Sequence, residues 1–128
     1  MSAGVQQHDE EHYDVVVPTG GRPSLQRLLD ALASQRRTVP GRVFLVDDRP
    51  DPSSPLLPEG PPSGLDVIVV RGRGAGPAAA RNAGWRAASA PWVAFLDDDV
   101  MPGAEWSTDL AADLGACDDD VAAVQGRI

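Results

Sequence analysis

An apolar run that stops at three consecutive carboxylates constrains the fold of this 128-residue chain more than any other feature. Residues 92–96 read WVAFL, and Asp97, Asp98 and Asp99 follow directly. A short apolar run between prolines is typical of a buried strand of a parallel sheet rather than of a helix. The three acids are therefore expected at the carboxyl end of that strand, the edge of an open α/β sheet where ligands bind.

Three adjacent carboxylates indicate a cation site. On an extended chain, side chains two residues apart point the same way, about 6 to 7 Å apart. Asp97 and Asp99 would then face one ligand, while Asp98 points elsewhere. Neighbouring anions repel one another unless a cation or a donor offsets their charge. The simplest candidate is Mg²⁺ or Mn²⁺, which binds through one or two carboxylates and takes its other ligands from phosphates and water.

A second acid triplet, Asp118 to Asp120, serves as an internal comparison. It precedes a predicted strand at residues 121–125, so it is expected at the opposite edge of the sheet, as a solvated loop. A calcium loop of the EF-hand type is excluded for Asp97 onward, because Met101 and Pro102 stand where an oxygen ligand and a glycine are needed. Position along the sheet, not composition, separates the two triplets.

Strand and helix patterns alternate along the chain. Leucines and an alanine at helical spacing predict one apolar helix face, with Ser24 as its N-cap and Arg36 and Arg37 at its end. Further helices are predicted from Pro77 to about Ser89 and after residues 102–103. The predicted strands are residues 13–17, 43–46, 65–70, 92–96 and 121–125. This alternation predicts an α/β fold with a largely parallel, Rossmann-like sheet and helices on both faces.

Length and charge limit the classes of function. Residues 13–128 are enough for one domain, and residues 1–12 are expected to form a disordered acidic tail. Eleven Lys and Arg against 19 Asp and Glu give a net charge of -8, which disfavours nucleic acid as a partner. Cys117 is the single cysteine, so no internal disulfide forms. No apolar run approaches the length of a membrane span, and the predicted location is cytoplasmic.

Acids and cations recur at other predicted ligand-binding positions. Asp47 and Asp48 end the second strand, as Asp97 to Asp99 end the fourth. Residues 49–64 contain six prolines and predict a long loop without a helix. The Arg81-Asn82 pair lies in the helix that opens at Pro77. A helix N-terminus with cations near it suits a diphosphate.

A glycine stretch supplies a rival hypothesis. Residues 74–79 match G-x-G-x-x-A after a strand and before a helix, the pattern of a dinucleotide-binding turn. The match follows the third strand rather than the first. A dehydrogenase also needs one carboxylate for the ribose, which leaves Asp47 and part of the triplet without a role. A plain turn that lets an alanine-rich helix pack closely is compatible with either function.

Four segments in this order resemble the family 2 glycosyltransferases of the GT-A fold. They are residues 15–19 (VVVPT), 44–48 (FLVDD), 76–84 (GPAAARNAG) and 95–99 (FLDDD). The resemblance covers residues 13–128 and implies the N-terminal, nucleotide-sugar-binding half of such an enzyme, with the acceptor half missing. It implies binding of a nucleoside-diphosphate sugar of the UDP or GDP type, and transfer of the sugar to an acceptor hydroxyl.

The resemblance also implies roles for individual residues. Asp97 and Asp99 look like the catalytic acids of the family's DxD motif. Asp99 would be the main ligand of Mn²⁺ or Mg²⁺, and Asp97 would lie nearer the ribose and the water shell of the metal. The remaining implied substrate-binding residues are Pro18, Thr19, Asp47, Arg81, Asn82 and Asp98. Among them, Asp47 would contact the base or the ribose.

Two alternatives to the glycosyltransferase function stay open, and the sequence does not identify the acceptor. The general base that an inverting transfer needs would lie beyond Ile128, so no residue is assigned to it. The chain could therefore be a nucleotide-binding fragment without catalysis. It could also be half of an NAD(P)-dependent oxidoreductase, as the glycine stretch allows.

Overall fold

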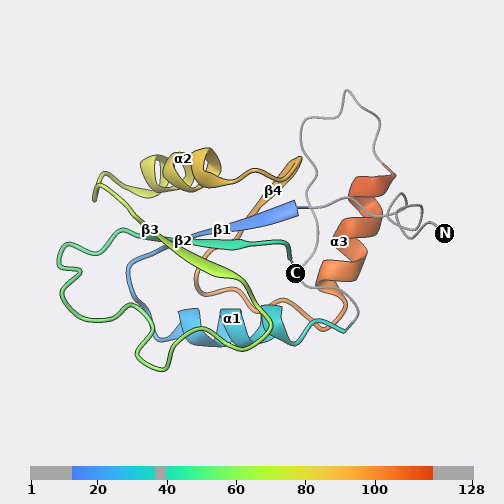
Figure 1. The fold of residues 1–128 in the computed structure, drawn as a ribbon, viewed down its shortest axis with the longest axis horizontal. Helices are drawn as coiled ribbons and strands as arrows, with labels where there is room; N and C mark the ends of the chain where they lie inside the picture. The colour runs from blue at the N-terminus through green and yellow to red at the C-terminus, as the bar shows by residue number, and fades with distance from the viewer. Residues whose placement is uncertain (1–12, 37–39, 117–128) are drawn as a thin grey trace.

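The computed structural model describes residues 13–36 and 40–116, which form a four-stranded parallel sheet and three helices. The strands lie in the order β3-β2-β1-β4, and the three neighbouring pairs are all parallel (Figure 1). The strands are β1 (Tyr13–Thr19), β2 (Val43–Asp47), β3 (Val67–Arg71) and β4 (Trp92–Phe95). The helices are α1 (Ser24–Ala33), α2 (Pro77–Ala87) and α3 (Trp106–Gly115). The predicted α/β class is confirmed.

Helices cover both faces of the sheet, as predicted. Figure 1 shows α1 on one side of the strands and α2 on the other. Side chains alternate along each strand, so Val15 and Val17 join the core beneath α1, whereas Val16 packs with Ala80 of α2. This double coverage explains the continuous apolar runs within these strands, residues 15–17 of β1 and 43–46 of β2.

Helix α1 follows the predicted apolar face closely. Its four leucines are at most 1% exposed: Leu25, Leu28, Leu29 and Leu32. Its ends differ from the prediction. Pro23 is the N-cap and Ser24 is the first helical residue, and the buried Ser24 Oγ has no hydrogen-bond partner among the described residues. The helix ends at Ala33, so Arg36 lies beyond it and pairs with Glu105 at 2.8 Å.

Helix α2 packs very close to the sheet. A Cβ built on Gly84 would lie 2.3 Å from Val16 Cγ1, which is closer than Cβ atoms approach other heavy atoms, so any larger residue would force helix or strand to shift. Ala80, one turn earlier, is 1% exposed. The small residues of this helix thus place its first turn directly over the ends of β1 and β2, as the alanine-rich sequence predicted.

Strand β4 is less buried than predicted. It is an edge strand in the described sheet, its residues are partly exposed, and Phe95 is 46% exposed. The strand also ends one residue earlier than predicted, at Phe95, although the Leu96 amide still donates a hydrogen bond to the Val16 carbonyl at 3.1 Å. Strand β3, at the other edge, begins at Val67, two residues later than predicted.

Four predictions concern parts of the chain outside the described residues: the tail at residues 1–12, Cys117, the second acid triplet and the fifth strand.

The long connection between β2 and β3 contains no helix or strand, as its prolines predicted. Leu56 and Leu57 of this loop pack against the core beneath α1.

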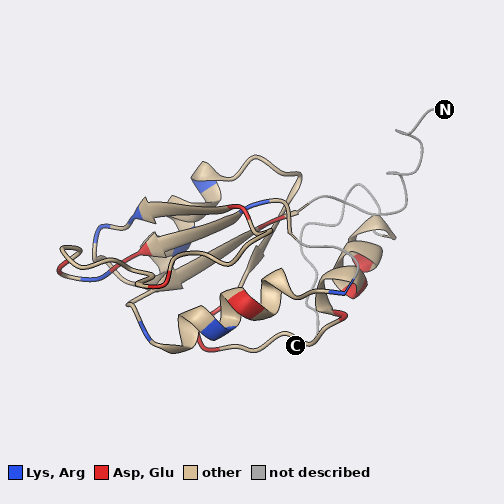
Figure 2. Ribbon diagram, turned by 60° about the horizontal axis from the view of Figure 1, so that its bottom comes forward, with Lys and Arg blue, Asp and Glu red and all other residues tan. Residues whose placement is uncertain are grey.

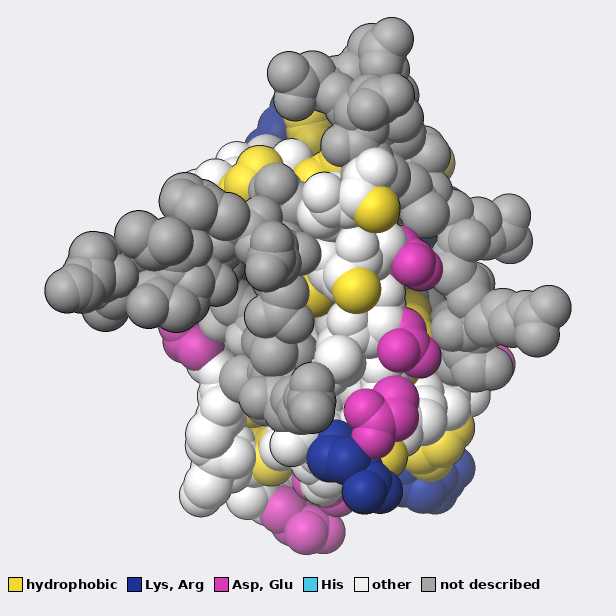
Figure 3. Space-filling model, turned by 90° about the vertical axis from the view of Figure 1, so that its right-hand side faces the viewer, with side chains coloured by type: hydrophobic (Ala, Val, Ile, Leu, Met, Phe, Trp, Pro, Cys, Tyr) yellow, Lys and Arg dark blue, Asp and Glu magenta, His cyan; other side chains and the backbone are white. Residues whose placement is uncertain are grey.

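On the side of the molecule that carries α3, acidic side chains form a row on the surface, and basic side chains lie at one end of this row (Figure 3). Within the described residues, no helix has both the length and the apolar character needed to cross a membrane.

Candidate functional site

The carboxyl ends of the strands and the first turn of α2 enclose a cavity of about 370 Å³. Acidic and basic residues both occur at this edge of the sheet (Figure 2). The lining residues come from four segments of the chain: Pro18, Thr19, Gly20, Arg22, Asp48, Pro77, Ala80, Arg81, Asp97, Asp98 and Asp99. The structure thus brings most of the sequence-predicted site residues together. Asp47 and Asn82 do not line this cavity.

The acid triplet forms a turn rather than the end of a strand. β4 stops at Phe95, and the Val100 amide donates a hydrogen bond to the Asp97 carbonyl at 3.3 Å. The expected alternation of an extended chain therefore does not apply, and all three carboxylates line the cavity. They differ instead in burial, because the side chain of Asp98 is 7% exposed, that of Asp97 71% and that of Asp99 54%.

Asp98 anchors the triplet to the loop that follows β1. Thr19 Oγ1 donates to Asp98 Oδ2 at 2.8 Å, and the Gly21 amide donates to Thr19 Oγ1 at 3.0 Å. Arg22 Nε lies 3.5 Å from Asp98 Oδ1. Both oxygens of this buried carboxylate are therefore engaged, which leaves Asp97 and Asp99 as the acids accessible to a ligand.

Two arginines that line the cavity pair with the acids. Arg22 Nη1 lies 3.3 Å from Asp99 Oδ2, and Arg81 Nη2 lies 3.9 Å from Asp97 Oδ1. Arg22 was not predicted as a site residue. Its signal in the sequence is a cation three residues after Thr19, in the same predicted turn. Two arginines against four lining carboxylates give the cavity a formal charge of -2.

The N-terminus of α2 borders the same cavity. Pro77 is the first helical residue, and the preceding Gly76 has a φ of 99°, a conformation that favours glycine. The positive end of a helix dipole stabilises anions, and Arg81 adds a full charge one turn further on. Asp48 holds the preceding glycine loop in place, because its Oδ1 accepts a hydrogen bond from the Gly74 amide at 2.7 Å.

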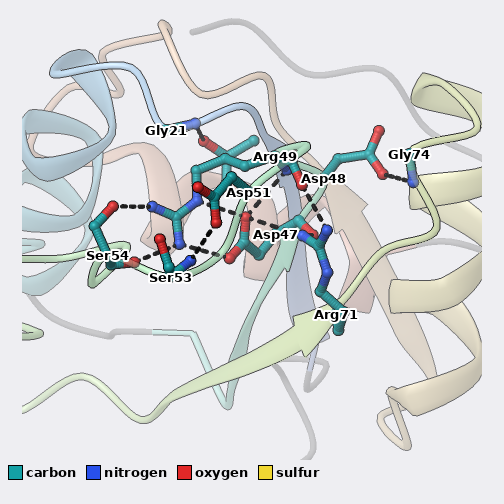
Figure 4. A network of polar contacts seen from close by, with 10 residues as sticks. Gly21, Asp47, Asp48, Arg49, Asp51, Ser53, Ser54, Arg71 and Gly74 are labelled. Carbon is teal, nitrogen blue, oxygen red and sulfur yellow. Dashed lines mark hydrogen bonds and ion pairs between the residues drawn. The ribbon is translucent and has the colours of Figure 1, made fainter.

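Asp47 belongs to a separate polar network (Figure 4). Its two carboxylate oxygens accept hydrogen bonds from Arg49 Nε and Nη2, each at 2.9 Å, and Arg71 Nη1 lies 3.5 Å from Oδ1. The hydrogen bonds from the Arg49 side chain hold the pKa of the Asp47 carboxyl below its usual value. Asp47 is 4% exposed. This carboxylate is a buried, fully paired ion.

The Asp47 network forms the polar side of a second cavity, of about 490 Å³, between β3 and the proline-rich loop. Arg49 Nη2 donates to the Ser54 carbonyl at 2.8 Å, and Arg71 Nη2 donates to the Arg49 carbonyl at 2.6 Å. The rest of the lining is apolar: Pro52, Pro55, Leu56, Leu57, Pro61, Val67 and Val69. The network thus ties the loop to the sheet.

The donor set of the first cavity fits a hard divalent cation that is only partly held by protein. In the described part of the chain, no three His, Cys, Asp or Glu side chains are grouped closely enough to hold a metal ion. Mg²⁺ and Mn²⁺ bind through one or two carboxylates plus phosphates and water. Asp97 and Asp99 supply two exposed carboxylates in a cavity with room for such ligands.

Comparison with known proteins places residues 14–128 in one family. The model of glycosyl transferase family 2 matches residues 14–128. The chain is 36% identical over 119 residues to the pre-mycofactocin glycosyltransferase of Mycobacterium tuberculosis, covering 89% of this chain and 23% of that protein. It is 33% identical over 105 residues to the succinoglycan biosynthesis protein ExoM of Rhizobium meliloti, covering 77% of this chain and 33% of that protein.

A solved structure agrees with these relatives. TarS of S. aureus superimposes with a TM-score of 0.66 and 27% identity, covering 79% of this chain and 31% of that one. The chain therefore spans a third or less of the relatives and of the solved structure that it matches.

Proposed function

This chain belongs to glycosyl transferase family 2, and on that premise we propose that its first cavity binds the sugar donor, a nucleoside-diphosphate sugar. A protein that contains this region would transfer the sugar to an acceptor hydroxyl. The proposed donors are sugars linked to UDP or GDP. The family match argues against the NAD(P)-dependent oxidoreductase hypothesis.

The observation that carries this proposal is that groups of both charges line one cavity. Asp97 and Asp99 are exposed there, and Arg81 and the N-terminus of α2 border the same space. A diphosphate alone would be repelled by the acids, and a cation alone would be repelled by the arginines. Together they satisfy both groups, which supports a metal-bound diphosphate as the ligand.

The residues of the cavity take distinct proposed roles. Asp99 and Asp97 would hold Mn²⁺ or Mg²⁺, which when bound supplies positive charge to the departing nucleoside diphosphate. Asp98 contributes by fixing the turn through Thr19, at 2.8 Å. Thr19 and Pro18 would line the nucleotide side, and Arg81 would pair with phosphate oxygens.

Two implied substrate contacts are less direct in this structure. Asp47 as a ligand of the base or ribose stays a prediction, because this carboxylate is 4% exposed and both of its oxygens already accept hydrogen bonds from Arg49. Asn82 is exposed on α2 outside the lining of the cavity, so its role also stays a prediction. The cytoplasmic location also stays a prediction.

In the transfer itself, the acceptor oxygen forms a bond to the anomeric carbon while the bond from that carbon to the diphosphate breaks. The cavity residues act on the leaving side of this exchange, by binding and orienting the diphosphate. A general base must take the acceptor proton, and none of the described residues is assigned to it.

Ligand-dependent stability tests the proposed donor site. UDP or GDP with Mn²⁺, at a concentration 100 times the dissociation constant, is expected to stabilise the chain by about 2.7 kcal/mol in a thermal shift assay. NADH is expected to have no effect with or without metal, and EDTA is expected to remove the effect of the nucleotides. Protection by NADH without metal, with neither UDP nor GDP effective, would overturn the proposal. Release of sugar from a labelled nucleotide sugar then separates an enzyme from a binding fragment.

A further inference from the structure

Arg22 contacts two acids of the triplet at once. It follows the Gly20-Gly21 turn after β1, and its Nε lies 3.5 Å from Asp98 Oδ1. Its Nη1 donates a hydrogen bond to Asp99 Oδ2 at 3.3 Å. One guanidinium therefore offsets the charge of two neighbouring carboxylates.

The two acids depend on Arg22 to different degrees. Asp98 is buried and keeps the hydrogen bond from Thr19 Oγ1 at 2.8 Å when the arginine is removed. Asp99 is half exposed, and in the described part of the chain its ion pair is the one with Arg22. Removal of the guanidinium would therefore leave the turn anchored and Asp99 uncompensated.

Arg22 itself is free to change partner. Its side chain is 63% exposed, and it extends from a loop whose neighbouring residue, Gly21, has a φ of 87°. Ion pairs at exposed positions contribute little to stability and exchange readily with solvent or other ions. A guanidinium also matches the geometry of a diphosphate as well as that of a carboxylate.

We propose that Arg22 is an exchangeable counter-ion of the acid triplet. It pairs with Asp98 and Asp99 while the cavity holds no cation, and it moves to the diphosphate when a divalent cation takes Asp99. A guanidinium and a divalent cation repel each other at one carboxylate, so the binding of either weakens the binding of the other. This inference rests on the proposed function, because it requires a cation and a diphosphate in the same cavity.

Arg22→Gln tests the exchange, because it should move two affinities in opposite directions. The affinity for Mn²⁺ alone is expected to rise about tenfold, since the competing cation is gone. The affinity for UDP or GDP at saturating Mn²⁺ is expected to fall about tenfold, since a charge-assisted hydrogen bond to phosphate is lost. Titration calorimetry measures both constants. Arg22→Lys keeps the charge, so its affinities for Mn²⁺ and for the nucleotide are expected to lie closer to those of the wild type.

Arg27→Gln is the matched control, because it removes one exposed arginine from α1 outside the cavity. It is expected to leave both constants unchanged, and circular dichroism verifies that all variants are folded. If the wild type binds Mn²⁺ and nucleotide but Arg22→Gln weakens both, or changes neither, the counter-ion role is overturned and the donor site stands. If the wild type binds neither, the proposed function fails and this inference fails with it.

Discussion

Replacing Asp99 by asparagine is expected to abolish the dependence of UDP or GDP binding on Mn²⁺. The change removes the charge of an exposed carboxylate, and an amide oxygen is a much weaker ligand for a hard cation. The fold should persist, because the ion pair between Asp99 and Arg22 is exposed and contributes at most about 1 kcal/mol. The Mn²⁺-dependent thermal stabilisation, about 2.7 kcal/mol at 100 times the dissociation constant, should disappear.

Asp119→Asn is the control for this result, since it makes the same change in the second acid triplet of the sequence. It is expected to leave the Mn²⁺ dependence intact. Equal losses from the two variants would show that overall negative charge, rather than the position of the triplet at the carboxyl edge, governs the binding. The positional argument would then be wrong.

Asp47→Asn is expected to destabilise the fold by about 2 kcal/mol, because it removes the carboxylate that accepts two charge-assisted hydrogen bonds from Arg49, whereas the hydrogen bond from Arg49 Nη2 to the Ser54 carbonyl remains. Chemical denaturation at pH 7 measures this change. Asp51→Asn is the matched control. Asp51 is exposed and accepts a hydrogen bond from the Ser53 amide at 2.9 Å. A much smaller change is expected there.

The pKa shift of Asp47 determines how the difference in stability between wild type and Asp47→Asn depends on pH. The pKa of Asp47 is lowered in the fold, chiefly by the hydrogen bonds from Arg49. The stabilisation is therefore complete above the unfolded value, about 3.9, and is lost as the pH falls through the lower folded value. The difference between wild type and variant should be constant near neutral pH and shrink below about pH 4. A difference that persists unchanged at pH 2 would contradict an ionised Asp47 as its source.

The sequence was sufficient to predict the architecture, because periodicity is a local property. The leucine spacing of α1 and the uninterrupted apolar runs of β1 and β2 follow from which faces are buried. The edge position of β4 was not predictable in the same way. A strand order depends on pairing between distant segments, and Phe95 is as apolar as a central residue.

The sequence predicted most residues of the site but not which side chains form ion pairs with one another. Arg22 and Asp99 are 77 residues apart, and only the fold brings their side chains together. The separation of Asp47 from Asp48 could have been foreseen. Alternation along β2 places Asp47 on the same side as Val43 and Leu45, beneath α1, whereas Asp48 lines the first cavity. The turn at the acid triplet, by contrast, could not be predicted from the spacing of its residues.

Paramagnetic broadening by Mn²⁺ tests most directly whether the cation and the nucleoside diphosphate share the first cavity. In a spectrum of the ¹⁵N-labelled chain, substoichiometric Mn²⁺ with UDP or GDP is expected to broaden the amide signals of Thr19 to Arg22 and of Asp97 to Asp99. The amides of Leu56 and Leu57, beside the second cavity, should stay sharp. Broadening centred on Leu56 and Leu57, with the acid triplet unaffected, would contradict the assignment of the donor site.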